Sequence, residues 1–264
     1  MEQKRKSDMT ESPYIADRFH DQVALVVGGA QGIGKAISVR LAREGAKVII
    51  GDIDRAMMKK TVAEIADQGC SIRAVWCDVR RPRQVERMVA KVIQRYKQVD
   101  ILVYVAGVVQ SLQFVKTGER EWDHTLDINL KGAFLTARAV VPHMIKRKRG
   151  KLIFMSSTNS WDAEAQLAAY NASKSGIYLL CKTLARELGP YGINSNAVGP
   201  GLIRTRLSEP FIKNPRFMKR YENLIPVGRI GLPEDVAGPA TFLASRDADY
   251  VNGVLLFVDG GQLA

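Results

Sequence analysis

Short apolar runs alternate with longer amphipathic stretches along most of the chain. The runs have the length and composition of β-strands, whereas the stretches between them repeat apolar residues at helical spacing. The expected strands are residues 23–27, 47–51, 72–77, 101–105, 151–155, 193–198 and 254–258. The expected helices are residues 32–44, 55–68, 82–96, 122–147, 170–188 and 233–244. This repeated order predicts an α/β fold in which helices cover both faces of a parallel sheet.

The length of 264 residues fits one domain. We expect residues 1–20 to form a flexible N-terminal tail and residues 21–264 to form the domain. Residues 202–225 are basic and interrupted by Pro210 and Pro215, which favours a substrate lid. No apolar run approaches the ~20 residues that cross a bilayer, and the polar start lacks an export signal. These features predict a cytoplasmic protein without a membrane span.

The cysteines and histidines give no support for a disulfide framework or a metal site. The three cysteines are widely spaced, which is typical of a reducing compartment, and the three histidines lack the spacing of a ligand set. These residues are Cys70, Cys77, Cys181, His20, His124 and His143. We therefore expect no catalytic metal.

The formal net charge of +12 is compatible with binding to nucleic acid or to an anionic surface. However, the densest basic run, residues 146–149, ends a predicted helix just before Gly150. Cations there complement the negative end of the helix dipole, and glycine can cap the helix. We interpret the run as a solvated helix end and expect no nucleic-acid or membrane partner.

A glycine-rich turn joins the first expected strand to the first expected helix. It contains Gly28, Gln31, Gly32, Ile33 and Gly34. Glycines let the backbone turn sharply and approach a pyrophosphate, and the free amides at the start of the helix favour the anion. Such a cluster alone would fit an ordinary turn about as well, but its place between a strand and a helix favours dinucleotide binding.

Asp52 ends the second expected strand and is followed by Ile53. In a dinucleotide-binding fold, an acid at this position accepts hydrogen bonds from the adenosine ribose hydroxyls. A 2′-phosphate would meet like charge there, so Asp52 favours NAD(H) over NADP(H). Two alternatives stay open: Arg55 could reach a phosphate, and Asp52 could be a helix N-cap, although Asp54 fits that role better.

Tyr170 and Lys174 lie one turn apart on a predicted helix and therefore on nearly the same face. An ammonium about 4 Å from a phenol contributes roughly 4 kcal/mol at an effective dielectric constant of ~20, or about three pK units before desolvation, which opposes it. We therefore expect Lys174 to lower the pKa of Tyr170 toward neutrality. Ser157 follows the fifth expected strand and could orient the reacting oxygen. The alternative is that these residues only pack, cover the surface and cap a strand.

Together these motifs resemble the short-chain dehydrogenase/reductase family from Phe19 to the C-terminus. The glycine turn is similar to the family's TGxxxGxG motif, and Ser157, Tyr170 and Lys174 are similar to its catalytic serine and YxxxK motif. The remaining similar positions are Asp78-Val79 near the adenine, Ala106-Gly107 after the fourth strand, Asn129 in a helix, and Pro200, Gly201, Ile203 and Thr205 near the nicotinamide.

The resemblance implies a single-domain, doubly wound Rossmann fold with a seven-stranded parallel sheet, assembled as a homotetramer. It also implies hydride transfer between NAD(H) and an alcohol or carbonyl substrate. In this scheme Ser157 holds the reacting oxygen, Tyr170 transfers its proton, Lys174 stabilises tyrosinate and binds the nicotinamide ribose, and Asn129 positions a water in the proton relay.

The chain departs from the family pattern at three places. Val27 replaces a threonine, Tyr104-Val105 replaces a pair of asparagines, and Asn194-Ser195-Asn196 replaces Arg-Val-Asn. Apolar replacement of both partners of a hydrogen bond can be nearly neutral, whereas an orphaned buried partner costs about 1–3 kcal/mol. The departures would therefore weaken NAD binding or stability wherever they orphan a buried partner.

The residues expected around the substrate mix polar groups with one aromatic ring, which favours a sugar, a polyol or a cyclic secondary alcohol. They are Val108, Gln110, Asn159, Trp161, Asp162, Gln166, Arg204 and Arg206. The basic lid residues Arg216, Lys219 and Arg220 would suit an anionic substrate, but an exposed lid face explains them more simply.

Two other functions stay open. An NADPH-dependent 3-oxoacyl-thioester reductase is disfavoured by Asp52. A catalytically weak NAD-binding scaffold or regulator is disfavoured by the intact Ser157, Tyr170 and Lys174, although the missing asparagine pair favours it.

Overall fold

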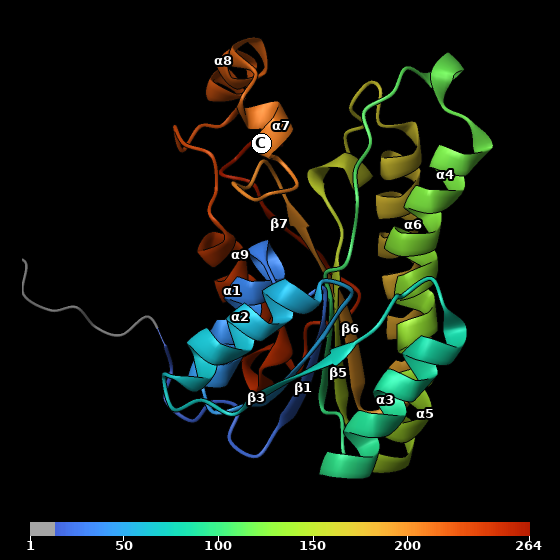
Figure 1. The fold of residues 1–264 in the computed structure, drawn as a ribbon, viewed down its shortest axis with the longest axis vertical. Coiled ribbons are helices and arrows are strands. Elements are labelled where there is room, and N and C mark those ends of the chain that lie inside the picture. Colours follow the sequence, from blue (N-terminus) through green and yellow to red (C-terminus); the bar gives the residue numbers. More distant parts are fainter. Residues whose placement is uncertain (1–13) are drawn as a thin grey trace, which may run out of the picture.

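The computed structural model describes residues 14–264, in which seven strands form one parallel sheet (Figure 1). The strands are β1 (Val23–Val27), β2 (Lys47–Asp52), β3 (Ile72–Trp76), β4 (Ile101–Tyr104), β5 (Gly150–Met155), β6 (Ile193–Pro200) and β7 (Leu255–Val258). Their order across the sheet is β3-β2-β1-β4-β5-β6-β7. The order reverses between β1 and β4, which is where an open α/β sheet forms its ligand crevice. The predicted doubly wound, seven-stranded parallel fold is confirmed.

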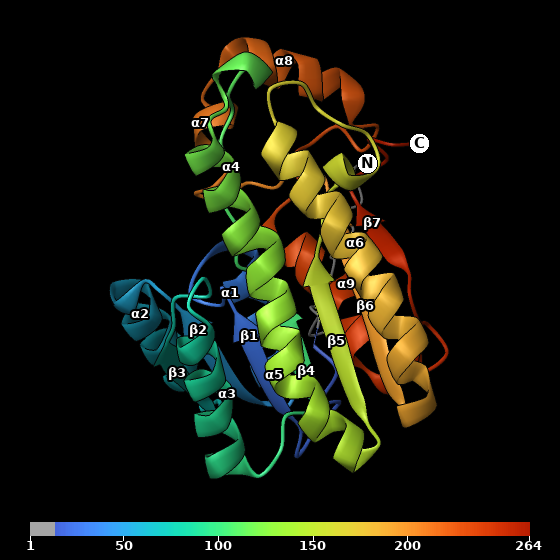
Figure 2. The same cartoon turned by 90° about the vertical axis from the view of Figure 1, so that its right-hand side faces the viewer.

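Helices cover both faces of the sheet (Figures 1 and 2). One face carries α1 (Gly32–Arg43), α2 (Arg55–Ala66) and α9 (Pro233–Ala244); the other carries α3 (Pro82–Tyr96), α4 (Glu119–Leu126), α5 (Gly132–Arg147) and α6 (Ala168–Leu188). Two further helices, α7 (Glu209–Ile212) and α8 (Pro215–Leu224), lie beyond the carboxyl ends of the strands. Residues 122–147, expected as one helix, are interrupted by a π-helical turn (Asp127–Lys131) between α4 and α5.

The central strand β1 shows why the strands are continuous apolar runs. All five of its residues are buried. Ala24 and Val26 pack into the apolar layer under α1 and α9, whereas Val23, Leu25 and Val27 pack into the layer under α3 and α5. Because successive side chains point to opposite faces, a strand that is covered on both sides must be apolar throughout.

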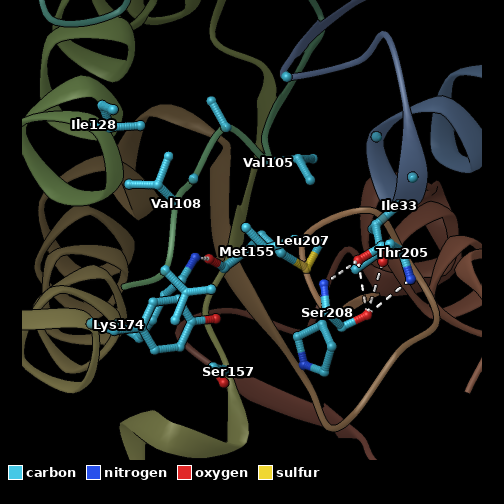
Figure 3. A pocket seen from close by; sticks show the side chains of 18 of the residues that line it. Ile33, Val105, Val108, Ile128, Met155, Ser157, Lys174, Thr205, Leu207 and Ser208 are labelled. Atoms are coloured by element: carbon cyan, nitrogen blue, oxygen red, sulfur yellow. Dashed lines mark hydrogen bonds between the residues drawn. The ribbon is translucent and has the colours of Figure 1, made fainter. Parts of the chain in front are cut away.

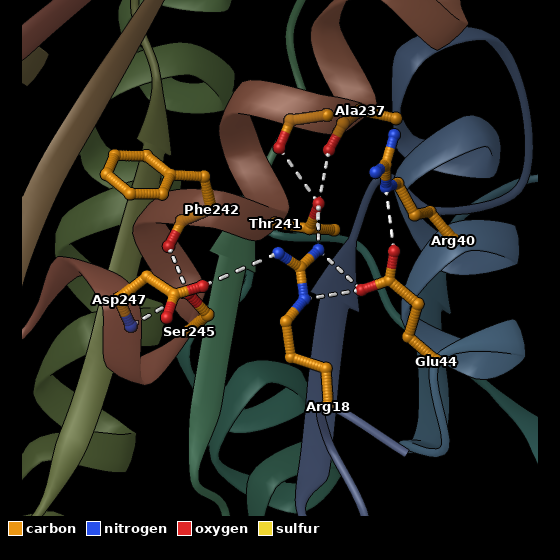
Figure 4. Close-up of polar contacts among 9 residues, drawn as sticks. Arg18, Arg40, Glu44, Ala237, Thr241, Phe242, Ser245 and Asp247 are labelled. Carbon is orange, nitrogen blue, oxygen red and sulfur yellow. Dashed lines mark hydrogen bonds and ion pairs between the residues drawn. The ribbon is translucent and has the colours of Figure 1, made fainter. Parts of the chain in front are cut away.

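The segment before β1 packs against the helix layer (Figure 4). Phe19 is fully buried, and so is the carboxylate of Glu44 at the end of α1. Arg18 Nε donates to Glu44 Oε2 at 2.7 Å, and Arg18 Nη2 donates to Thr241 Oγ1 of α9 at 3.1 Å. Arg18 therefore ties the start of the chain to two helices.

The expected boundary between a tail of residues 1–20 and a domain of residues 21–264 needs correction at its edge, because Arg18 and Phe19 pack with the domain. Residues 1–13 lie outside the described residues. Within residues 14–264, no helix has the length and apolar character that crossing a membrane requires.

Candidate active site

A cavity of about 710 Å³ opens at the carboxyl ends of β1, β4, β5 and β6 (Figure 3). Except for Asn129, every residue expected to bind the cofactor or to act in catalysis lines it. In Figure 3, Ile33 and Thr205 stand on one side, and Ser157 and Lys174 on the other. The structure therefore brings motifs that are far apart in the sequence to one site.

The glycine turn forms one wall of this cavity between β1 and α1. Gly28 has φ of +82°, and a Cβ there would lie 2.5 Å from the backbone nitrogen of Ala106. The N-cap residue of α1, Gln31, makes no side-chain hydrogen bond to the helix. The start of α1 thus presents uncapped amides and the positive end of its dipole to the cavity, as pyrophosphate binding requires.

Asp52 lies at the carboxyl end of β2, beside the glycine turn. Its Oδ2 accepts from Ala30 N at 3.1 Å and its Oδ1 from Asp54 N at 3.0 Å, so the carboxylate is fixed at the cavity wall. Asp54 is the N-cap of α2 and accepts from Met57 N at 3.0 Å, which confirms that the capping role belongs to it. The position of Asp52 therefore suits ribose recognition.

The arginine side chains near Asp52 and Asp78 already interact with other residues of the chain. The guanidinium of Arg55 stacks 4.6 Å from the ring centroid of Trp76 and does not line the cavity. Arg206 was expected at the substrate, but it lies 3.9 Å from Asp54 Oδ2, near the end of β2. Arg80, which the sequence interpretation missed, pairs with Asp78 at 2.7 Å and lowers the pKa of that carboxyl through a hydrogen bond.

Helix α6 carries Tyr170 and Lys174 on the face toward the cavity, and Ser157 follows β5. Lys174 is 4% exposed, its Nζ donates to Met155 O at 2.8 Å, and it lies 5.5 Å from the Tyr170 ring centroid. Burial lowers the pKa of Lys174 to about 8. Three groups that could hold and protonate a reacting oxygen therefore meet in one desolvated place.

The expected lowering of the Tyr170 pKa is wrong. Burial raises the pKa of Tyr170 above its ordinary value, and a hydrogen bond with Ser157 only partly opposes that rise. Lys174 is itself desolvated, so its positive charge is less favoured than in water. Spacing from Lys174 therefore does not by itself bring the pKa of Tyr170 toward neutrality.

The same helix contains a second tyrosine–lysine pair at the same spacing. Lys182 Nζ lies 5.4 Å from the Tyr178 ring centroid, almost the separation seen for Lys174 and Tyr170. Tyr178 and Lys182 do not line the cavity. The spacing alone is therefore not sufficient for the chemistry, and position at the crevice distinguishes the two pairs.

Asn129 is fully buried in the π-helical turn and does not line the cavity. Its Oδ1 accepts from Val108 N at 2.8 Å, and its Nδ2 donates to Val108 O at 3.0 Å and to Ser173 Oγ at 2.9 Å. A Cβ at Gly107 would lie 3.3 Å from Asn129 Oδ1 and 3.5 Å from Lys174 Nζ. Its side chain thus joins the loop after β4 to α6, rather than facing the substrate.

The substrate end of the cavity differs from the expected polar wall. Of the eight residues expected there, Val108, Asn159 and Arg206 line the cavity, whereas Trp161 is 74% exposed and does not. Gln110, Asp162, Gln166 and Arg204 do not line it either.

Aromatic residues of α7 and α8 line this part of the cavity. Phe211, Phe217 and Tyr221 line the cavity, with ring centroids 5.5 Å apart for the first pair and 4.4 Å for the second. Tyr221 Oη donates to Glu164 Oε2 at 3.0 Å, and Arg220 pairs with Glu164 at 3.5 Å. The aromatic residues between 211 and 221 were the signal that could have revealed this wall.

The departures from the family pattern leave no orphaned partner at the glycine turn. Val27 and Tyr104 are cross-strand neighbours and both are buried. Among residues 14–264, the buried side-chain atoms without a hydrogen bond belong to His143, Arg147 and Gln262. None of these unpaired atoms belongs to the residues of the glycine turn or to Tyr104 and Val105.

Ionisable side chains do not gather into a metal-binding group. In the described part of the chain, no cluster of three or more His, Cys, Asp or Glu residues is placed to hold a metal ion, and Cys70, Cys77 and Cys181 are free thiols.

Comparison with known proteins places this geometry among dehydrogenases and reductases. A family model described as enoyl-(acyl carrier protein) reductase matches residues 28–262. The chain is 37% identical to the 3-oxoacyl-(acyl-carrier-protein) reductase FabG of Thermotoga maritima over 92% of this chain and 98% of the relative. It is also 37% identical to the L-rhamnose-1-dehydrogenase of Scheffersomyces stipitis, over 92% and 96%.

A solved structure is also similar to this chain. It is a putative NAD(P)-dependent gluconate 5-dehydrogenase from Beutenbergia cavernae with bound NADP at low occupancy. It superposes with a TM-score of 0.89 at 32% identity, covering 92% of this chain and 97% of that one.

Proposed function

We propose that this chain, which belongs to the short-chain dehydrogenase/reductase family, is an NAD(H)-dependent oxidoreductase that interconverts a secondary alcohol and its carbonyl. One observation carries the proposal: Ser157, Tyr170 and Lys174 line the same cavity as the glycine turn and Asp52. The first three residues can act on a reacting oxygen, and the glycine turn and Asp52 can bind a dinucleotide.

The reaction is alcohol plus NAD⁺ to carbonyl plus NADH and a proton. A bound nicotinamide supplies the hydride acceptor or donor. Ser157 holds the substrate oxygen, and Tyr170 removes its proton during oxidation or returns it during reduction. The role of Lys174 is electrostatic, because its ammonium stabilises the tyrosinate that forms.

The proposed preference for NAD(H) rests on Asp52. We expect Asp52→Asn to lower the ratio of kcat/KM for NAD⁺ to that for NADP⁺ by about tenfold or more, because removing the carboxylate removes repulsion toward a 2′-phosphate. Asp67→Asn, an exposed change at the end of α2, is the matched control. An unchanged ratio in Asp52→Asn would remove the basis of the preference, as would a wild-type preference for NADP(H).

The substrate we propose is a cyclic secondary alcohol with an apolar ring, rather than a sugar or polyol. The lid wall of Phe211, Phe217 and Tyr221 offers a contact surface for such a ring, together with Leu207 and Val108. This wall supplies few hydrogen-bonding groups for a chain of hydroxyls. Of the three substrate classes expected from the sequence, the proposal keeps the cyclic alcohol and drops the sugar and the polyol.

Phe217→Ala should raise KM for a cyclic alcohol about tenfold while kcat stays nearly constant, because the lost aromatic contact acts on bound substrate and transition state alike. Phe114→Ala is the control, since Phe114 is 77% exposed and outside the cavity wall. Steady-state kinetics with a cyclohexanol series, sorbitol and a 3-oxoacyl thioester tests this. A clear preference for sorbitol would contradict the apolar class, and a preference for the thioester with NADPH would favour the reductase alternative.

The homotetramer and the cytoplasmic location implied by the resemblance stay proposals. Light scattering coupled to size-exclusion chromatography, and fractionation of cells, would test each of them directly.

A further inference from the structure

Tyr104 is the last residue of β4 and does not line the cavity. It is 1% exposed within the apolar layer under α3 and α5. Its hydroxyl donates to the backbone carbonyl of Ile128 at 2.5 Å. A buried tyrosine hydroxyl needs such a partner, and this one lies on the turn between α4 and α5.

Ile128 belongs to the π-helical turn, where the backbone pairing has shifted by one residue. The amide of Gly132 donates to Asp127 O, although in a regular α-helix it would donate to Ile128 O. The Tyr104 hydroxyl supplies Ile128 O with a donor from outside the helix. This hydrogen bond therefore favours the widened turn over a continuous helix.

Gly132 provides the space for the hydroxyl. A Cβ at this position would overlap Tyr104 Oη and would also lie 3.0 Å from Val79 Cγ2. The Tyr104 hydroxyl at the end of β4 thus occupies space that Gly132, at the start of α5, leaves free. Neither feature alone would place the hydroxyl on Ile128 O.

The turn held in this way carries Asn129. From Asn129 Nδ2 a hydrogen bond runs to Ser173 Oγ at 2.9 Å, and Ser173 Oγ donates to Tyr170 O at 2.7 Å. A continuous series of short contacts therefore links the Tyr104 hydroxyl, through the turn, to the backbone of the candidate acid/base.

We propose that Tyr104 is a positioning residue, whose hydroxyl, accommodated by Gly132, holds the π-helical turn so that Asn129 fixes α6 at Tyr170. Its effect on turnover rests on the proposed function. Its effect on the turn does not, because that effect can be measured without substrate.

Hydrogen exchange followed by mass spectrometry tests the effect of Tyr104 on the π-helical turn. Tyr104→Phe should raise amide exchange several-fold in peptides covering residues 124–133, while peptides of β1 and α9 stay unchanged. Tyr96→Phe is the matched control, because Tyr96 packs against the same apolar layer from the last residue of α3, outside residues 124–133. Gly132→Ala gives an independent second variant and should affect the same peptides. Unchanged exchange at residues 124–133 in both variants would overturn the proposal.

Steady-state kinetics test the effect of Tyr104 on turnover. Tyr104→Phe should lower kcat about tenfold and change KM for NADH less than about twofold, since misplacement affects the reacting groups more than cofactor affinity. In an Asn129→Ala background the same change should have almost no further effect. Full additivity of the two changes would show that Tyr104 does not act through Asn129. Raised exchange in Tyr104→Phe, together with a wild-type protein that shows no turnover, would instead count against the proposed function alone.

Discussion

Tyr170→Phe should lower kcat by a factor of about 10²–10⁴ in both reaction directions, because the variant keeps the ring but cannot exchange a proton with the substrate oxygen. NADH binding should persist, since the glycine turn and Asp52 are untouched. Stopped-flow absorbance of the nicotinamide measures the first effect, and quenching of tryptophan fluorescence by NADH measures the second.

Tyr178→Phe is an unusually close control for that change. Tyr178 lies on the same helix, with a lysine four residues later at nearly the same ring distance, but outside the cavity. Loss of the Tyr178 hydroxyl should leave kcat within about twofold of wild type. Equal loss of activity in the two variants would mean that helix stability, and not proton transfer, explains the effect of Tyr170→Phe.

Arg18→Met should lower the free energy of unfolding by about 3 kcal/mol, because it removes one partner of a buried carboxylate. Glu44 has no exposed surface, and Arg18 and Arg40 hold its two oxygens at 2.7 and 2.9 Å (Figure 4). Arg40 would remain, so the carboxylate would keep part of its compensation. Urea denaturation at neutral pH measures the change.

Lys47→Met is the matched control for Arg18→Met. Lys47 pairs with Asp21 at 3.1 Å, but both side chains are more than two-fifths exposed, at 43% and 73%. A surface pair of this kind contributes about 0–1 kcal/mol. If Arg18→Met cost no more than this control, the buried network would have no special role in stability.

The layers of the fold could be predicted from the sequence because they depend on local periodicity. The interruption after α4 could not. The apolar pattern continues through residues 122–147, and the π-helical turn involves the hydroxyl of Tyr104 on a distant strand. The packing of Arg18 was missed for the same reason, since Glu44 and Thr241 are far from it in the chain.

In the candidate site, too, the features with local sequence signals could be predicted, and those that depend on distant contacts could not. Strand ends and the glycine turn have local signals, so the residues expected to bind a cofactor could be grouped from the sequence, and the structure brings them to one cavity. The substrate wall depends on how the lid folds back, which no spacing specified, and the aromatic residues at 211, 217 and 221 replaced the expected polar set. The direction of the Tyr170 pKa was wrong because spacing indicates proximity to Lys174 but does not give the size of the competing desolvation.

Deuterium transfer from NADH that carries two deuterium atoms at C4 to a carbonyl substrate is the most direct measurement of hydride chemistry in this cavity. With a cyclic ketone, we expect wild-type protein to form an alcohol carrying one deuterium at the former carbonyl carbon, seen by mass spectrometry, and Tyr170→Phe to form almost none. Tight NADH binding without transfer to any cyclic ketone, sugar or 3-oxoacyl thioester would contradict the proposed oxidoreductase function. It would favour a dinucleotide-binding scaffold instead.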